Sequence, residues 1–396
     1  MRFLLVLLLL LSPAVAHAQF VRAEGKRFVT PDGATLHIRG INLGNWLMQE
    51  GYMFKFTRSK SPRQIDAVVA RVLGRDGADA FWREFRSQYV TEADIRFIAS
   101  AGFNTVRVPL HYNLFMPGDR FAGEGYRLLD NVIAWAKAAN LRVIIDLHAA
   151  PGGQTGINHD DGPGIPLMFY VPAHRRATVA LWRDLAARYR DEPAVLGYDL
   201  LNEPIAPYHD QDTLNPRLEP MYRELVSAIR AVDANHIIFL AGAQWSTTFE
   251  ALGPPFAKNL AYTYHKFWSS TERDAVQPYL DFSNLYNVPI LLGETGELDD
   301  DWNRRFRTLN EKHGIGWSFW TYKNLDTPST VVSVKRPANW GLITKLAAKL
   351  PDEWTPADQP PAAAAKQALA DYLVNIRFEN GVVRRTYLES LGLAAK

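Results

Sequence analysis

Short apolar runs alternate with amphipathic stretches along most of the chain. Each run is rich in Val, Ile, Leu and aromatic residues and stops at a Gly, Pro or polar position, which is the pattern of a buried parallel strand. The predicted strands are residues 36–43, 103–108, 142–147, 194–198, 236–241, 260–265, 289–293 and 314–322. Apolar positions at helical spacing predict helices at residues 62–73, 77–100, 125–140, 173–190, 218–232, 271–286, 299–313, 338–350 and 362–376.

This alternation over roughly 300 residues predicts an α/β fold, a (β/α)8 TIM barrel with helical insertions. A doubly wound sheet is the alternative, but the Gly-x-Gly-x-x-Gly run that would favour it after the first strand is absent. Ahead of the barrel, residues 21–30 and 35–39 flank Pro31-Asp32-Gly33 and predict a β-hairpin that closes the bottom of the barrel. The Pro/Ala-rich bend at 351–365 precedes too little chain for a second domain, so residues 19–396 are expected to form one domain.

The first 18 residues have the pattern of a secretory signal peptide. Arg2 precedes an apolar run from Phe3 to Leu11, and Ala16-His17-Ala18 forms an A-x-A cleavage site. We therefore expect export to the periplasm or the medium, with a mature chain that starts near Gln19. No other uncharged run approaches about 18 residues, so no membrane span is expected after cleavage.

Composition narrows the classes of function. The net charge of +2 argues against a nucleic-acid partner. The lack of cysteine excludes disulfides, thiolate nucleophiles and cysteine metal sites. Aromatic residues make up 12% of the chain, with 11 Trp and 16 Tyr. They fit either a well-packed core or a carbohydrate cleft, because the C–H faces of sugars stack on aromatic rings.

Polar residues that could do chemistry stand at the ends of six predicted strands. In a barrel the carboxyl ends of all the strands meet at one face, where active sites lie. Each residue alone has a structural explanation, as a surface charge or a satisfied core residue, but their agreement across six strands favours a shared site. The set is Arg107, His148, Asn202, Glu203, His265, Glu294 and Trp320.

Glu203 and Glu294 are a pair that suits glycoside hydrolysis. One glutamate would protonate the leaving oxygen while the other attacks the anomeric carbon or activates water. Their strands lie across the barrel from each other, which is compatible with the separation of about 5–5.5 Å in a retaining pair. No cofactor or metal is expected, since His-Glu-x-x-His is absent, the strand-end arginine would repel a cation, and residues 158–161 lack EF-hand spacing.

The same residues, taken in order, resemble glycoside hydrolase family 5, a family of retaining β/α-barrel glycosidases. The matching segments are Arg107-Val108-Pro109, Asp146-Leu147-His148, Leu201-Asn202-Glu203-Pro204, Tyr264-His265, Leu292-Gly293-Glu294-Thr295-Gly296 and Trp320-Thr321-Tyr322-Lys323. The resemblance implies that Glu203 is the acid/base, that Glu294 is the nucleophile and that Asn202 binds the sugar 2-hydroxyl. The positions implied to orient these carboxylates or to contact sugar are Arg107, His148, His265 and Trp320, the last as the stacking floor of subsite −1.

Two loops are similar to those of the exo-β-1,3-glucanase group of that family. They are residues 40–50, which supply Trp46 and Glu50 as candidate sugar contacts, and residues 148–156. In that group the acid that matches Glu50 binds the terminal glucose and blocks further subsites. The acid expected after the second loop appears here as Asn158 or has shifted to Asp160.

A second departure from that group follows the sixth strand. Phe267 replaces the tyrosine that would donate a hydrogen bond to the nucleophile, so Tyr264 is a candidate substitute. Phe267 and Trp268 are expected to form an aromatic wall on the +1 side. Glu297 is expected to cap the helix that begins near Asp299, with sugar binding as the alternative.

Together these features predict an exported retaining glycoside hydrolase that cleaves β-1,3 or β-1,4 bonds of a glucan. Two alternatives use the same fold: a transglycosylase that remodels a bacterial β-glucan, and a non-catalytic carbohydrate-binding barrel. The expected partner is a β-glucan oligo- or polysaccharide, and the protein is expected to be a monomer.

Overall fold

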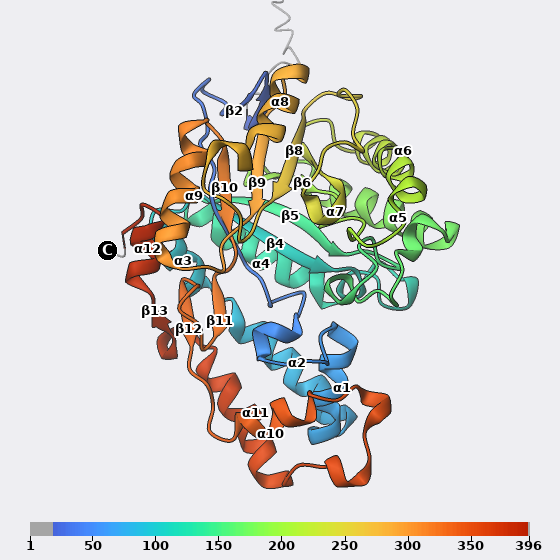
Figure 1. Cartoon of the computed structure of the whole chain (residues 1–396), viewed down its shortest axis with the longest axis vertical. Helices are drawn as coiled ribbons and strands as arrows, with labels where there is room; N and C mark the ends of the chain where they lie inside the picture. The colour runs from blue at the N-terminus through green and yellow to red at the C-terminus, as the bar shows by residue number, and fades with distance from the viewer. Residues whose placement is uncertain (1–18, 395–396) are drawn as a thin grey trace, which may run out of the picture.

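A closed barrel of eight parallel strands forms the centre of the molecule (Figure 1). The structure is a computed structural model and describes residues 19–394, so the predicted signal peptide lies outside the described residues. The barrel strands are β3 (Arg39–Asn42), β4 (Thr105–His111), β5 (Arg142–Ala149), β6 (Val195–Asp199), β7 (Ile237–Ala241), β8 (Leu260–His265), β9 (Ile290–Glu294) and β10 (Gly316–Phe319). Pairing of β10 with β3 closes the ring, and the predicted TIM barrel is confirmed.

Helices surround the barrel and extend below it in Figure 1. They are α1 (Pro62–Leu73), α2 (Arg75–Tyr89), α3 (Glu92–Ser100), α4 (Glu124–Ala138), α5 (Pro172–Tyr189), α6 (Gln211–Arg230), α7 (Ala243–Ser246), α8 (Gln277–Tyr286), α9 (Asp300–Lys312), α10 (Trp340–Leu346), α11 (Ala362–Asn375) and α12 (Arg385–Ser390). Across residues 19–394, no helix combines the length and the apolar character needed to cross a bilayer.

Several predicted helices have different bounds in the structure, and two of the differences have a clear physical reason. The helix predicted at 77–100 is broken at Thr91, whose backbone N–H donates to the Asp94 carboxylate at 2.7 Å and starts α3 as a new helix. α6 begins at Gln211 rather than at residue 218. Pro216 and Pro220 lie inside α6, and their poor fit to a helix interior concealed its first two turns from sequence reasoning.

The N-terminal segment forms two turns where one hairpin was predicted. β1 (Arg22–Glu24) and β2 (Arg27–Val29) pair antiparallel, and the turn at residues 31–33 then returns the chain so that the Leu36 N–H donates to the Phe28 carbonyl at 2.8 Å. The segment packs a small apolar cluster against the amino ends of the barrel strands, which confirms that it closes the bottom. The cluster contains Val21, Phe28, Ile38, Ile144, Leu196, Ile237, Phe239, Ala261 and Leu291.

A helical layer of α1, α2, α10 and α11 supports the loop that leaves β3. The loop runs into a short 3-10 helix at Gly51–Phe54, where Phe54 packs on Tyr372 with ring centroids 5.6 Å apart. The Trp340 indole N–H donates to the Phe54 carbonyl at 3.0 Å. A small sheet of β11 (Lys323–Leu325), β12 (Val332–Val334) and β13 (Val382–Val383) joins this layer to the barrel. The loop therefore has a fixed support on the side away from the barrel.

Candidate active site

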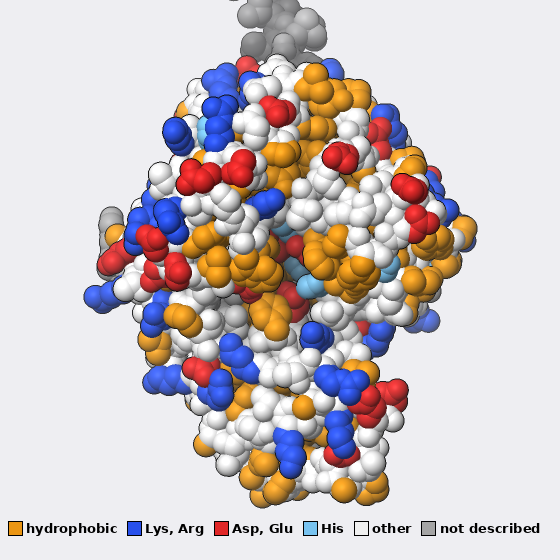
Figure 2. Space-filling model, viewed as in Figure 1, with side chains coloured by type: hydrophobic (Ala, Val, Ile, Leu, Met, Phe, Trp, Pro, Cys, Tyr) orange, Lys and Arg blue, Asp and Glu red, His pale blue; other side chains and the backbone are white. Residues whose placement is uncertain are grey.

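A cleft of about 500 Å³ opens at the carboxyl ends of the barrel strands, a size typical of a small-molecule site. Figure 2 shows acidic and histidine side chains at the base of a hollow near the centre of this face, with hydrophobic side chains around it. The cleft is lined by Glu50, Tyr52, His148, His159, Glu203, Trp245, Thr247, His265, Phe267, Trp268, Glu294, Glu297 and Trp320.

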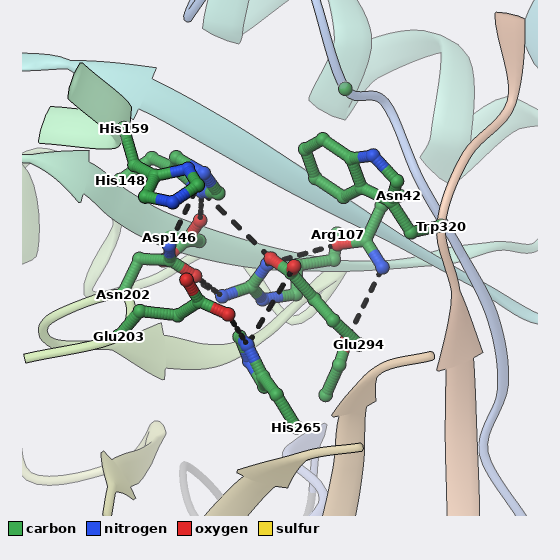
Figure 3. Close-up of polar contacts among 12 residues, drawn as sticks. Asn42, Arg107, Asp146, His148, His159, Asn202, Glu203, His265, Glu294 and Trp320 are labelled. Carbon is green, nitrogen blue, oxygen red and sulfur yellow. Dashed lines mark hydrogen bonds and ion pairs between the residues drawn. The ribbon is translucent and has the colours of Figure 1, made fainter. Parts of the chain in front are cut away.

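Arg107, on β4, is a buried cation that contacts three carboxylates beneath this cleft (Figure 3). Its side chain is fully buried, and its Nη1 contacts Glu294 Oε1. Its Nε donates to Asp199 Oδ2 at 2.9 Å, and its Nη2 lies 3.0 Å from Asp146 Oδ1. A buried guanidinium is tolerated because carboxylates and amide oxygens satisfy its donors. Arg107 therefore fixes the position of the Glu294 carboxylate and favours its ionised form.

Glu294, the last residue of β9, is 4% exposed. Besides Arg107, two histidines face its carboxylate: His265 Nδ1 at 3.6 Å and His148 Nδ1 at 3.9 Å. Burial opposes a charge on His148, but the Asp146 carboxylate, 2.8 Å from His148 Nδ1, more than offsets it and raises the pKa of His148. Glu294 is therefore surrounded by cationic and hydrogen-bonding groups.

Glu203 lies just past β6 in a backbone conformation with φ +46°, a region that non-glycine residues rarely occupy. Its carboxylate Oε1 is 3.0 Å from His265 Nδ1, and its carbonyl accepts a hydrogen bond from Thr155 Oγ1 at 2.8 Å. One carboxylate oxygen of Glu203, one of Glu294 and a ring nitrogen of His265 lie within 4.8 Å of one another. The two glutamates thus face each other across a gap close to that of a retaining pair.

The two carboxyls share a proton near neutral pH. Burial raises the pKa of both Glu203 and Glu294, and the two groups titrate as a coupled pair. Arg107 touches Glu294 and lowers its pKa, as does His148. In the singly protonated pair, direct contact with Arg107 places the negative charge on Glu294 and leaves the proton on Glu203. Burial keeps the pKa of His265 well below its ordinary value, so the ring between the glutamates is neutral.

Asn202 and Trp320 complete the predicted set. Asn202 is 1% exposed; its Oδ1 accepts from Arg107 Nη2 at 3.0 Å and its Nδ2 is 3.2 Å from His148 Nε2. The Trp320 ring stacks on the His148 ring at 5.6 Å with an interplanar angle of 19°. The structure therefore brings these two residues to the glutamate pair, and Trp320 lines the cleft.

Two predicted sugar contacts are packed in the hydrophobic core, away from the cleft. Trp46 is fully buried, and its indole N–H donates to the Arg86 carbonyl at 2.7 Å, so it packs loop 43–50 onto α2. Tyr264 is fully buried, and its hydroxyl donates to Asn310 instead of Glu294. Strand alternation accounts for the second error, because Tyr264 and its neighbour His265 point to opposite faces of β8. Arg107 supplies the contact to Glu294 that a tyrosine was expected to make.

Glu297 does not cap the helix that follows it. The cap of α9 is Asp299, whose carboxylate accepts from the Trp302 N–H at 2.8 Å. Glu297 lines the cleft instead, where its carboxylate is hydrogen-bonded to Tyr52 and burial raises its pKa to about 6. Its φ of +64° is a second rarely occupied backbone conformation at the site.

Some residues that line the cleft escaped the sequence prediction: Tyr52, His159, Trp245 and Thr247. Trp245 follows β7 in a run of three non-glycine residues with positive φ, Gln244 (+50°), Trp245 (+59°) and Ser246 (+60°), a signal that only coordinates reveal. Asp160, the displaced acid of the second loop, does not line the cleft, whereas its neighbour His159 does. The predicted aromatic wall is present, with the Phe267 and Trp268 rings 5.7 Å apart.

Two groups of potential ligand atoms occur here, one formed by Asp146, His148 and Glu294 and the other by Glu203, His265 and Glu294. Arg107 contacts both Asp146 and Glu294 and offsets part of their negative charge. A cation placed at either group would be repelled by this guanidinium, so the arrangement favours carboxylate chemistry.

Comparison with known proteins agrees with this geometry. The sequence model of the family described as Cellulase (glycosyl hydrolase family 5) matches residues 70–326. A β-xylosidase of Phanerodontia chrysosporium is 28% identical over 77% of this chain and 71% of its own length. A probable glucan 1,3-beta-glucosidase A of Aspergillus clavatus is 30% identical over 66% of each chain.

The chain spans about half to two thirds of the length of several glucan 1,3-beta-glucosidases that it matches. The crystal structure of rutinosidase from Aspergillus niger has the same fold, with a TM-score of 0.60, 20% identity, and coverage of 74% of this chain and 91% of that one. Because the family model covers well over half of the sequence, the chain belongs to glycosyl hydrolase family 5, and the family and the glucosidase relatives indicate a glycoside hydrolase.

Proposed function

We propose that the protein is an exported retaining β-glycosidase that removes sugar units from a β-linked glucan, with Glu203 as acid/base and Glu294 as nucleophile. The observation that carries this proposal is the facing pair itself: two carboxylates with oxygens within 4.8 Å, of which Arg107 contacts Glu294. The pair is asymmetric in its charge environment, as two-step chemistry requires.

In the first step, protonated Glu203 gives its proton to the glycosidic oxygen while the Glu294 carboxylate attacks the anomeric carbon. The bond from that carbon to the leaving oxygen breaks, and a covalent glycosyl ester forms on Glu294. Esterification removes the negative charge of Glu294 beside Arg107. The pKa of Glu203 then falls, because the repulsion that favoured its protonated form has gone.

In the second step, the Glu203 carboxylate takes a proton from water, and the resulting hydroxide attacks the anomeric carbon. The ester bond to Glu294 breaks and its carboxylate returns to Arg107. We assign Asn202, which Arg107 and His148 hold beside the glutamates, to the sugar 2-hydroxyl, where a hydrogen bond strengthens in the transition state.

The choice of glucan rests on the relatives and on the cleft. Glucan 1,3-beta-glucosidases are among the relatives near 30% identity, which favours β-1,3-linked glucose. Glu50, Tyr52 and Glu297 line the cleft together and offer hydroxyl-binding groups. Removal of terminal units is proposed from the resemblance of loop 40–50, in which the acid that matches Glu50 binds the terminal glucose. The enzyme is proposed to act as a monomer. Export is proposed from the signal-peptide pattern of residues 1–18.

The test uses Glu203→Gln and Glu294→Gln on laminarin, β-1,4-glucan and mannan, with product sizing by mass spectrometry. Each substitution should lower turnover by at least about 10²–10⁴-fold, the contribution of general acid–base catalysis alone. The matched control is Glu192→Gln, which changes a partly buried glutamate that precedes β6 and does not line the cleft. Wild-type hydrolysis by both cleft variants would end the proposal.

A further inference from the structure

A charged pair stands in the cleft beside the two glutamates. His159 Nδ1 lies 3.2 Å from Glu50 Oε2, and the other oxygen of Glu50 lies 3.9 Å from His148 Nε2. The Glu50 side chain is 5% exposed and that of His159 is 30% exposed. Both line the cleft with Glu203, and Figure 3 shows His159 on the side of the site opposite Trp320.

The loop that carries His159 is built around its neighbour Asp160, which is 1% exposed. The Asp160 carboxylate accepts hydrogen bonds from the N–H groups of Thr155 at 2.6 Å, Gly156 at 2.8 Å and Gly162 at 2.8 Å. These three bonds close the loop on itself. Since a fixed loop loses little freedom when sugar binds, His159 is held in advance of binding.

A second anchor comes from α1. Arg63 Nη1 donates to the Asp161 carbonyl at 2.6 Å, and its Nη2 donates to the Gly162 carbonyl at 2.9 Å. His111 Nε2, at the end of β4, lies 3.7 Å from Asp161 Oδ2. Arg63 and His111 thus tie residues 161–162, which follow His159, to α1 and to the end of β4.

Glu203 has two opposing tasks in the proposed reaction, which is the basis of this inference. It must give up a proton in the first step and accept one in the second. The carboxylates around Glu203 favour its protonated form in the free enzyme, which slows departure of the proton in the first step. A fixed cation beside Glu203 would correct this imbalance.

We propose that His159, paired with Glu50, supplies this cation to Glu203 and an N–H donor to the sugar held against Glu50. The inference rests on the proposed function and adds a specific control on its acid/base. It also accounts for the displaced acid of the second loop, because Asp160 fixes the loop while His159 faces the cleft.

The charges around the pair support this role. Burial opposes a charge on His159, but the contact with Glu50 raises its pKa to about 9, so the ring is a cation at neutral pH. After burial, His159 is the strongest influence on Glu203 and lowers its pKa, whereas Glu50 raises it. The charged and titratable groups that face Glu203 or His159 are Glu50, Arg107, Asp146, His148, Asp160, His265, Glu294 and Glu297.

The experiment compares the pH dependence of kcat/KM for His159→Gln, Glu50→Gln and His37→Gln. The alkaline limb reports the acid that must be protonated in the free enzyme. It should move up by about one pH unit in His159→Gln, the low end of the effect of a neighbouring opposite charge. Glu50→Gln removes a carboxylate but also lowers the pKa of His159, so its alkaline limb should move less than that of His159→Gln. His37 is exposed beside the amino end of β3, so His37→Gln should leave the limb unchanged.

A second variant and an NMR titration test the inference if His159→Gln loses activity or fails to fold. His159→Lys keeps a cation, so its alkaline limb should remain closer to that of the wild type than the limb of His159→Gln. In addition, ¹³C NMR of the Glu203 carboxyl, assigned by its loss in Glu203→Gln, follows the titration without substrate. An unchanged or lower Glu203 pKa in His159→Gln would overturn the inference. Wild-type turnover by Glu203→Gln would instead overturn the proposed function, and the NMR titration would still decide the role of His159.

Discussion

Trp320 and Tyr52 are joined by a hydrogen bond of 2.6 Å from the indole N–H to the phenol oxygen. Tyr52 is also hydrogen-bonded to the Glu297 carboxylate, so Trp320 is tied through Tyr52 to a second loop. The His148 ring stacks against Trp320. The indole plane is therefore held in one orientation before a sugar arrives.

Tyr52→Phe should weaken substrate binding more than it slows the chemical step. The variant keeps the ring but leaves the Trp320 N–H and the Glu297 carboxylate without this partner. The net contribution of a hydrogen bond is about 0.5–1.5 kcal/mol, so its loss should raise KM by about 2- to 10-fold. Steady-state kinetics on laminarin oligosaccharides measures it. Tyr170→Phe, an exposed tyrosine that does not line the cleft, is the control. A fall in kcat at constant KM would contradict the expectation.

Arg107→Lys should be severe although it conserves charge. Lysine cannot reproduce the planar fork that reaches Asp146, Asp199 and Glu294 together. Buried carboxylates left without partners cost about 3–5 kcal/mol, so both the free energy of unfolding and kcat/KM should drop, the latter by more than about 100-fold. Urea unfolding and kinetics test this. Arg183→Lys, at an exposed position of α5, should match the wild type in both.

The strand-end residues were predictable because their position follows from local sequence. Glu203 and Glu294 each follow an apolar run that ends at a strand terminus, and a parallel barrel gathers those ends on one face. The assignment failed where the direction of a side chain mattered. Trp46 and Tyr264 lie in the right segments but point into the core.

Tyr52 and His159 could not be predicted, because contacts between distant segments place them. The 3-10 helix with Tyr52 is held by Trp340, and the loop with His159 is held by Arg63. The spacing between these partners follows no short motif in the sequence. Glu297 was missed for a different reason, because the local cap signal belongs to Asp299 two residues later.

Glu203→Gln should stabilise the fold at alkaline pH. The pKa of Glu203 is raised from 4.5 to about 7, so its contribution to stability is fully present below about pH 4.5 and is lost as pH rises through about 7. Glutamine cannot ionise, so the variant does not lose this stability as the pH rises. Between pH 5 and pH 8, the free energy of unfolding of Glu203→Gln should rise by about 2–3 kcal/mol relative to that of the wild type. Urea unfolding at both pH values measures it, and an equal difference at the two would refute the buried titration.

Trp268→Ala should separate binding of the leaving portion from chemistry. The Trp268 ring is 65% exposed, its φ is +50°, and it lies beside Phe267 at the cleft wall. A large exposed aromatic in a rare backbone conformation is a costly arrangement that favours a binding role.

A sugar at +1 would cover that ring, so loss of the ring should raise KM for laminarin oligosaccharides several-fold. β-Glucosyl fluoride carries no sugar beyond −1, and its turnover by Trp268→Ala should stay near that of the wild type. Leu285→Ala, which removes a 73% exposed side chain on α8, controls for general surface effects. Equal losses on both substrates would place Trp268 on the glycone side instead, because only a contact to the −1 sugar is shared by the fluoride and the oligosaccharide.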